Sequence, residues 1–149
     1  MKIMGLDYGS KTVGVAMSDE LLITSQPKEI IRRDRESKIR KTLARIEELI
    51  VLNDVRGVVI GLPVNMDGSE GERAKAALAF KDMIERRTGL RCYMSDERLT
   101  TVEADEIMDR MNIRVDDRKT YVDMIAANVI LQEFMENNPD TIAAIKAGN

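Results

Sequence analysis

Near its N-terminus the chain reads Ile3-Met4-Gly5-Leu6-Asp7-Tyr8-Gly9-Ser10-Lys11-Thr12-Val13-Gly14-Val15-Ala16-Met17. It consists of two short apolar runs joined by the turn Tyr8-Gly9-Ser10-Lys11, and this pattern predicts a β-hairpin. Asp7 ends the first run, next to glycines that let a phosphate or a metal ion approach the backbone. The alternative role is a turn aspartate that bonds to its own backbone. The positions of the other acidic residues bear on this choice.

The composition restricts the chemistry. A chain of 149 residues that is 44% hydrophobic and 33% charged predicts one globular domain with a large core. The absence of histidine excludes Ser-His-Asp and Cys-His catalysis, and with Cys92 as the only cysteine it leaves no ordinary zinc site. Any metal must bind oxygen ligands, which indicates Mg²⁺ or Mn²⁺. One cysteine and the lack of a membrane-length or signal-peptide pattern predict a cytoplasmic protein with no membrane partner.

The net charge of the whole chain does not favour binding to nucleic acid, because 26 acidic residues outnumber 23 basic ones. Nucleic acid would have to bind at a local patch of basic residues. The segment 32–41 carries six basic residues and two acidic ones, and it leads into a predicted amphipathic helix from about Arg35 to Leu52. It is either a solvated helix face or a patch that contacts phosphate.

The order of predicted elements indicates an α/β fold. After the hairpin, residues 21–24 and 29–31 extend it into a meander with Pro27 on an edge. Buried strands are predicted at 55–60 and 90–95, and further helices end at about Arg87, Arg110 and Glu136. Their predicted capping residues are Ser69, Thr100 and Asp117, and Gly89 closes the second helix. We expect a mixed five-stranded sheet with helices on both faces, one domain over 1–138 and a poorly ordered tail over 139–149.

Acidic residues fall where strands end. Asp7 ends the first strand, and Asp96 and Glu97 end the last one. Asp123 is the one acid in the apolar stretch 121–131, where a carboxylate is costly unless it has a partner or binds a metal. Three carboxylates facing one cleft repel each other, and a divalent cation relieves this repulsion. The pattern is typical of metal-assisted phosphoryl chemistry.

Four stretches resemble the YqgF (RuvX) family: KIMGLDYGSKTVGVA at 2–16, GLPVNMDG at 61–68, DERLTT at 96–101 and VDMIAA at 122–127. The resemblance extends from Lys2 to about Phe134. It implies a ribonuclease H-like fold related to the RuvC Holliday-junction resolvases. It also implies a cytoplasmic bacterial nuclease that resolves Holliday junctions or matures the 5′ end of pre-16S ribosomal RNA.

The resemblance also implies the site residues. Asp7 and Asp123 take the first and last metal-binding positions. RuvC carries its middle glutamate on the strand that here runs through 58–61, where this chain has no acid. Glu97 on the next strand is the expected replacement because its longer side chain reaches further, with Asp96 as the alternative. The metal would be Mg²⁺ or Mn²⁺.

Several polar residues are predicted to contact the substrate. Lys11, Arg73 and Arg98 are candidates for phosphate contacts, and Arg118 and Lys119 are candidates to assist them. The alternative for each is an exposed, solubilising charge. A loop containing Asn65, Asp67 and Gly68 is expected to shape the cleft.

The resulting prediction is a metal-dependent endonuclease that acts on structured RNA or branched DNA. Symmetric resolution of a junction needs two active sites, which would make the protein a homodimer. One alternative is a non-catalytic binding protein on the same fold, with ribosomal RNA, the ribosome or transcription proteins as partners. A second alternative arises because Asp7 to Thr12 also resembles the first phosphate loop of actin-like ATPases and sugar kinases. Those enzymes enclose a nucleotide between two domains, and this chain predicts one.

Overall fold

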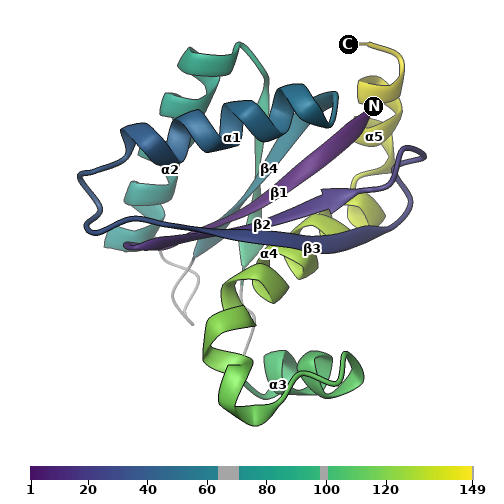
Figure 1. Ribbon diagram of the computed structural model, residues 1–149. Coiled ribbons are helices and arrows are strands. Elements are labelled where there is room, and N and C mark those ends of the chain that lie inside the picture. Colours follow the sequence, from purple (N-terminus) through teal and green to yellow (C-terminus); the bar gives the residue numbers. More distant parts are fainter. Residues whose placement is uncertain (64–70, 98–100, 149) are drawn as a thin grey trace.

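The structure is a computed structural model that describes residues 1–63, 71–97 and 101–148 (Figure 1). In this part of the chain a five-stranded sheet has the order β3-β2-β1-β4-β5. The strands are β1 (Lys2–Tyr8), β2 (Thr12–Ser18), β3 (Ser25–Arg32), β4 (Val55–Pro63) and β5 (Cys92–Glu97). β1 pairs with β2, and β2 with β3, in antiparallel fashion, whereas β4 is parallel to both β1 and β5. The predicted mixed five-stranded sheet is confirmed.

The predicted meander is present, with shifted boundaries. The hairpin turn closes through the Gly9 N–H, which donates to the Thr12 carbonyl at 2.8 Å. The third strand is β3 alone, on the sheet edge where Pro27 was expected. Residues 21–24, which were expected to be extended, instead form a loop in which the Asp19 carboxylate accepts N–H bonds from Ile23 and Thr24 at 2.8 and 3.1 Å. The Asp19 side chain thus satisfies backbone N–H groups that would otherwise bond to a neighbouring strand.

Helices cover both faces of the sheet, as predicted (Figure 1). α1 (Arg40–Leu52) and α2 (Glu72–Thr88) lie on one face. α4 (Arg118–Asn137) and α5 (Pro139–Lys146) lie on the other face. α3 (Thr101–Arg110) stands away from the sheet and packs on the first half of α4, where Met108 and Ile125 are buried together. No helix in the described ranges is both long enough and apolar enough to cross a bilayer.

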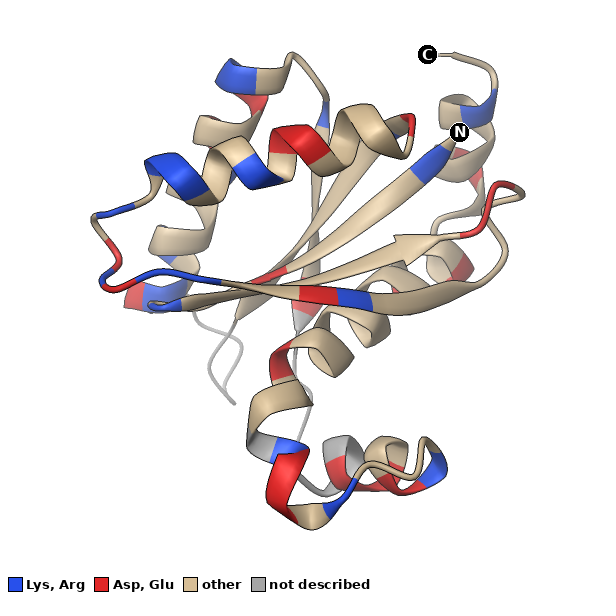
Figure 2. Ribbon diagram, viewed as in Figure 1, with Lys and Arg blue, Asp and Glu red and all other residues tan. Residues whose placement is uncertain are grey.

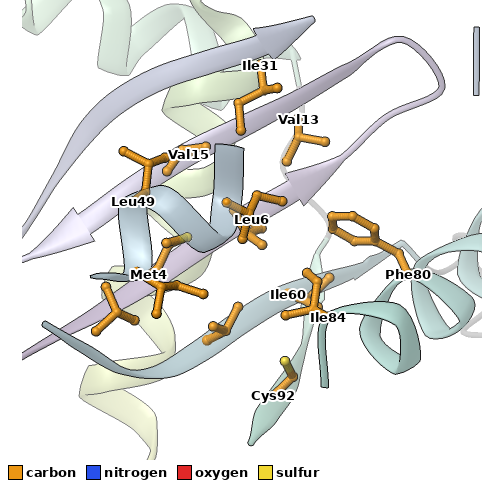
Figure 3. Packing of buried hydrophobic residues seen from close by; sticks show 14 of the residues in the cluster. Met4, Leu6, Val13, Val15, Ile31, Leu49, Ile60, Phe80, Ile84 and Cys92 are labelled. Atoms are coloured by element: carbon orange, nitrogen blue, oxygen red, sulfur yellow. The ribbon is translucent and has the colours of Figure 1, made fainter. Parts of the chain in front are cut away.

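The alternation of strand residues divides the core into two layers. The layer under α1 and α2 contains Met4, Leu6, Val58, Ile60 and Phe80, all at most 1% exposed (Figure 3). The layer under α4 and α5 contains Ile3, Val59, Leu131 and Phe134. β1 and β4 therefore bury both of their faces, which explains why 55–60 has a continuous β-branched pattern instead of an alternating one.

The helix ends differ in part from the predictions. Gly89 has a φ of 73° and ends α2, as predicted. Asp117 precedes α4 as expected, but its side chain makes no capping hydrogen bond. The predicted caps Ser69 and Thr100 lie outside the described residues, and α2 begins after Gly71.

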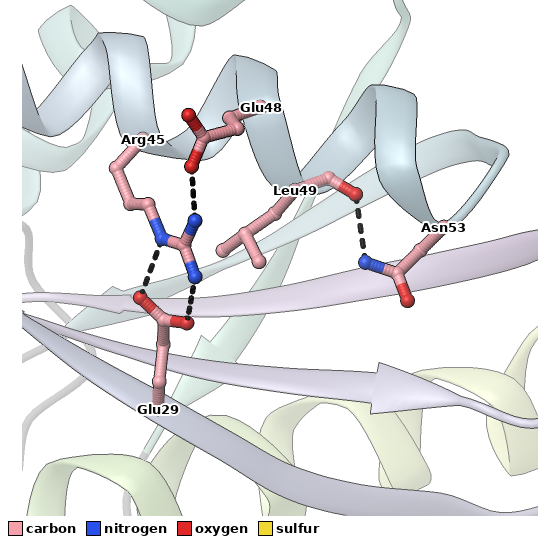
Figure 4. A network of polar contacts seen from close by, with 5 residues as sticks. All are labelled: Glu29, Arg45, Glu48, Leu49 and Asn53. Carbon is pink, nitrogen blue, oxygen red and sulfur yellow. Dashed lines mark hydrogen bonds and ion pairs between the residues drawn. The ribbon is translucent and has the colours of Figure 1, made fainter.

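The start of α1 was predicted five residues too early. Residues 33–39 form a turn, in which the Lys38 N–H bonds to the Arg35 carbonyl at 3.0 Å, and the helix begins at Arg40. Arg45 attaches α1 to the sheet edge because its guanidinium donates to Glu29 of β3 and to Glu48 of its own helix (Figure 4). The basic segment 32–41 therefore lies mostly in the loop between β3 and α1 (Figure 2).

The tail beyond residue 138 differs from the sequence expectation of weak order. Pro139 begins α5, a position that favours proline because the first helical N–H groups have no intrahelical partner. Ile142 and Ile145 lie one turn apart and are 6% and 4% exposed. Ile145 packs over Gly57, where the absence of a side chain leaves room for the helix. Two isoleucines in a short segment were enough to order it on the sheet.

Candidate metal-binding site

Asp7 lies at the end of β1 on the face that α4 covers. Alternation along β1 puts Ile3 in the core layer under α4, and Gly5 lies against α4, where an added Cβ would be 2.7 Å from the Leu131 Cβ. Asp7 is two residues further along and therefore belongs to the same face. Its side chain is partly buried, and its cross-strand partner in β2 is Gly14.

Gly14 brings α4 into contact with the hairpin at Asp123. A Cβ on Gly14 would lie 2.0 Å from the Asp123 carbonyl oxygen and 2.9 Å from the Met124 nitrogen. The helix backbone therefore rests directly on β2, and only glycine permits this distance. Because Gly14 pairs with Asp7, the two acidic residues are brought to the same place from positions 116 residues apart in the sequence.

Thr12 fixes the carboxylate of Asp123. Its hydroxyl donates to Asp123 Oδ2 at 2.5 Å, in a partly buried position. Thr12 and Gly14 are two residues apart on β2, so both belong to the α4 face. Sequence reasoning did not single out Thr12. The alternation of the strand carried the signal, since Thr12 shares this face with Gly14 and Ala16, and a polar residue there needs a partner.

The strand register separates the two candidate acids of β5. β4 and β5 pair Leu62 with Asp96 and Pro63 with Glu97. Tyr93 belongs to the core layer under α4, whereas Cys92 and Met94 belong to the opposite layer. Position 97 therefore lies on the same face as Asp7 and Gly14, while Asp96 lies on the other face and is exposed.

The acids do not all meet in the described part of the structure. Among the described residues, no three acidic or thiol groups are close enough to hold a metal ion together. The backbone of Glu97 is described, whereas its side chain lies outside the described residues. What the structure brings together is the pair Asp7 and Asp123, and position 97 lies on their face.

The residues predicted to contact the substrate lie at different places in the fold. Lys11 is exposed in the β1–β2 turn, beside the acids. Arg73 donates to Glu36 at 2.8 Å and lies over the Tyr8 ring, on the opposite face of β1. Arg118 is only 18% exposed and is paired with Asp105 and Asp109 of α3, so it is part of the α3–α4 contact. The predicted contacts Asn65 and Arg98, together with the loop residues Asp67 and Gly68, lie outside the described residues, as does the side chain of Lys119.

Tyr8 lies beside Asp7 but on the α2 side of the sheet. Its ring stacks on Phe80 with centroids 4.2 Å apart, and the Arg33 guanidinium lies 4.9 Å from its centroid. Burial raises the pKa of the Tyr8 hydroxyl, although the neighbouring Arg33 and Arg73 oppose this shift. Tyr8 thus stays neutral at physiological pH and packs as an aromatic residue in this layer.

Comparisons with known proteins identify the family. The family model described as RuvX, Holliday junction resolvase, matches residues 1–137. A relative from Agathobacter rectalis named "Putative pre-16S rRNA nuclease" is 56% identical over 91% of this chain and 95% of its own length. A protein of the same name from Streptococcus pyogenes is 45% identical over 93% of this chain and 99% of its own length. The chain therefore belongs to the RuvX family, and the resemblance seen in the sequence is confirmed.

Solved structures confirm the fold. RuvC from Thermus thermophilus superposes with a TM-score of 0.61 at 13% identity, over 95% of this chain and 98% of that one. The fowlpox virus Holliday junction resolvase gives a TM-score of 0.55 at 16% identity, over 92% of this chain and 99% of that one. The predicted ribonuclease H-like fold is thus correct. At these identities the likeness concerns the fold.

Proposed function

We propose that this chain is a metal-dependent endonuclease whose ligands are Asp7, Asp123 and Glu97. Membership of the RuvX family makes it a nuclease. The observation that carries the proposal is the contact of Gly14 with the Asp123 backbone, because Gly14 is also the cross-strand partner of Asp7. Two partly buried acidic residues from distant parts of the chain thus lie on the same face near the end of a central strand, where α/β sheets place their functional groups.

The donor set fits Mg²⁺ or Mn²⁺. The chain has no histidine, and its one cysteine is buried in the opposite core layer, so carboxylate oxygens are the available ligands. Divalent magnesium and manganese prefer such oxygen ligands. The bound ion would supply an activated water nucleophile and would neutralise charge on the scissile phosphate.

The residues of the chain have separate roles in this proposal. Asp7 and Glu97 hold the ion from β1 and β5, and the Thr12 hydroxyl keeps the Asp123 carboxylate in its rotamer. Lys11, exposed in the adjacent turn, contacts a phosphate next to the cleaved one. Asn65 and Arg98 stay predicted contacts to the nucleic-acid strand. Arg73, which already donates a hydrogen bond to Glu36, would contact the same nucleic-acid strand from the other face of β1.

We propose structured RNA as the substrate, because the curated relatives are named as nucleases of pre-16S ribosomal RNA. The reaction would then be maturation of the 5′ end of that RNA in the cytoplasm. The family description favours branched DNA as a second substrate, and cleaving it symmetrically would need a homodimer. A binding protein on the same fold, with ribosomal or transcription partners, is the remaining alternative.

A cleavage assay tests the proposal. Purified protein is incubated with a 5′-extended 16S RNA fragment and with a four-way DNA junction, in Mg²⁺, in Mn²⁺ and in EDTA. We expect cleavage of the RNA that requires the metal and is lost in Asp7→Asn and Glu97→Gln, while Asp96→Asn retains it. Binding without cleavage in either metal would favour the non-catalytic alternative, and cleavage unchanged in Asp7→Asn would refute the site.

A further inference from the structure

Arg33 is a buried arginine with unused hydrogen-bonding groups. Its side chain is 3% exposed, and its Nη2 donates to the Gly9 carbonyl at 2.7 Å. Its Nε and Nη1 are buried and have no hydrogen-bond partner among the described residues. The Glu36 carboxylate is 4.0 Å from Arg33 Nη2 and already receives hydrogen bonds from Arg73 at 2.8 and 3.3 Å. A buried guanidinium with two unpaired nitrogens is costly unless an anion completes its shell.

Arg33 lines a hollow whose walls are basic. The hollow has a volume of about 700 Å³ and is formed by residues 32–34 and 37–41. Five of these eight residues are basic, and the one acid, Asp34, is 90% exposed and pairs with Lys38 at 3.9 Å. The space is large enough for a phosphate group with its attached sugar, which is smaller than a typical small-molecule ligand.

The first turn of α1 opens onto this hollow. Ile39, which precedes the helix, provides no side-chain cap, and no acid occupies the first turn, where Arg40 and Lys41 lie. The first N–H groups of a helix have no intrahelical partner and, together with the helix dipole, attract anions. Natural helices usually satisfy these groups with Ser, Thr, Asp or Asn at this position. Here Arg33 and the first turn of the uncapped helix line the same hollow.

We propose that this hollow binds a backbone phosphate of the nucleic-acid substrate, at a fixed distance from the cleaved bond. Arg33 provides its Nε–H and Nη1–H donors, α1 provides backbone N–H groups, and Lys38 and Lys41 provide charge. The hollow is tied to the candidate metal site because the Arg33 N–H donates to the Lys11 carbonyl at 2.9 Å, in the turn that follows Asp7. The choice of nucleic acid as ligand rests on the proposed function. The phosphate chemistry rests on the hollow itself.

The first arm of the test uses inorganic phosphate with the whole protein. The Nε–H resonance of Arg33, assigned by NMR, should shift downfield as phosphate is added. Arg33→Gln should bind phosphate at least tenfold more weakly. Arg35→Gln is the matched control, since Arg35 is an exposed arginine in the same segment that does not line the hollow. Because Arg33→Gln also removes the guanidinium that lies over the Tyr8 ring, the exposed pair Lys38→Gln and Lys41→Gln provides a second test that leaves Arg33 in place.

The second arm measures RNA binding against salt in EDTA, where cleavage cannot contribute. Arg33→Gln should lower the slope of log affinity against log salt by about 0.7–0.9, the value for one lost phosphate contact. A slope equal to that of Arg35→Gln would overturn the proposal even if the protein proves to be a nuclease. Phosphate binding that RNA does not displace would overturn the assignment to nucleic acid. RNA binding that depends on Arg33, in a protein that never cleaves, would uphold this site and refute the nuclease.

Discussion

Replacing Gly14 by alanine should separate α4 from the hairpin. The new Cβ would start 2.0 Å from the Asp123 carbonyl oxygen and 2.4 Å from its carbonyl carbon. Ordinary contact begins near 3.4 Å, so the helix backbone must retreat by roughly 1.4 Å. Both neighbouring atoms belong to the backbone, and no side chain can rotate away to absorb the change.

The expected cost follows from the atoms that must move. Overpacking a well-packed site costs typically about 1–3 kcal/mol, and Gly14→Ala should reach about 3 kcal/mol or more because α4 moves as a unit. Gly5→Ala should cost about 1–3 kcal/mol, since its Cβ would lie 2.7 Å from the Leu131 Cβ and 2.9 Å from the Ala127 carbonyl oxygen. Gly57→Ala is the control. Its Cβ would meet the flexible tip of Ile145 at 3.3 Å, so its stability should stay within about 1 kcal/mol of wild type.

Equilibrium urea unfolding, followed by circular dichroism at 222 nm, measures all three variants. We expect the order Gly14→Ala, Gly5→Ala, Gly57→Ala from least to most stable. We also expect Gly14→Ala to lose metal-dependent cleavage at temperatures where it is folded, because Asp123 moves away from Asp7. Equal stability of Gly14→Ala and Gly57→Ala would refute the contact on which the site is built.

Two further predictions concern single groups. Thr12→Val should lower cleavage about tenfold while Thr12→Ser retains it, because serine keeps the hydroxyl that donates to Asp123; equal rates in the two variants would remove Thr12 from the site. Burial and the nearby Glu85 raise the pKa of the Cys92 thiol from 9.0 to about 12. The folded state therefore favours the neutral thiol. The contribution of this thiol to the free energy of unfolding is fully present below pH 9 and is lost as the pH rises toward 12. Between pH 8 and pH 10.5 the free energy of unfolding should fall about 2 kcal/mol more in wild type than in Cys92→Ala, and parallel pH profiles would contradict this.

The central part of the fold could be predicted because local patterns coincide with it. The hairpin follows from two apolar runs around a glycine turn, and the buried strand β4 follows from its β-branched run. The start of α1 could not be placed from hydrophobic periodicity, because Ile39 lies in phase with the helix although it precedes it. The helix formed by the tail could not be predicted either, because its packing depends on the space that Gly57, on the distant strand β4, leaves for Ile145.

The sequence allowed members of the candidate site to be proposed, but not their geometry. Strand ends and an acid in an apolar helix pointed to Asp7 and Asp123, which stay predicted ligands. The choice between Asp96 and Glu97 rested on side-chain length in the sequence, whereas the register of β4 with β5 gives a stronger reason. Thr12 was not singled out, and Arg33 was predicted only as one member of the basic segment 32–41, because their particular contacts, to Asp123 and to the Gly9 carbonyl, arise only in the tertiary structure.

We propose that one metal site forms on the α4 face of the sheet from Asp7, Asp123 and Glu97. Isothermal titration of the protein with Mn²⁺ measures this site without any assumption about the substrate. We expect saturable binding to wild type that weakens at least tenfold in Asp7→Asn, Asp123→Asn and Glu97→Gln and is unchanged in Asp96→Asn, which lies on the opposite face. Binding that is lost in Asp96→Asn and retained in Glu97→Gln would contradict it.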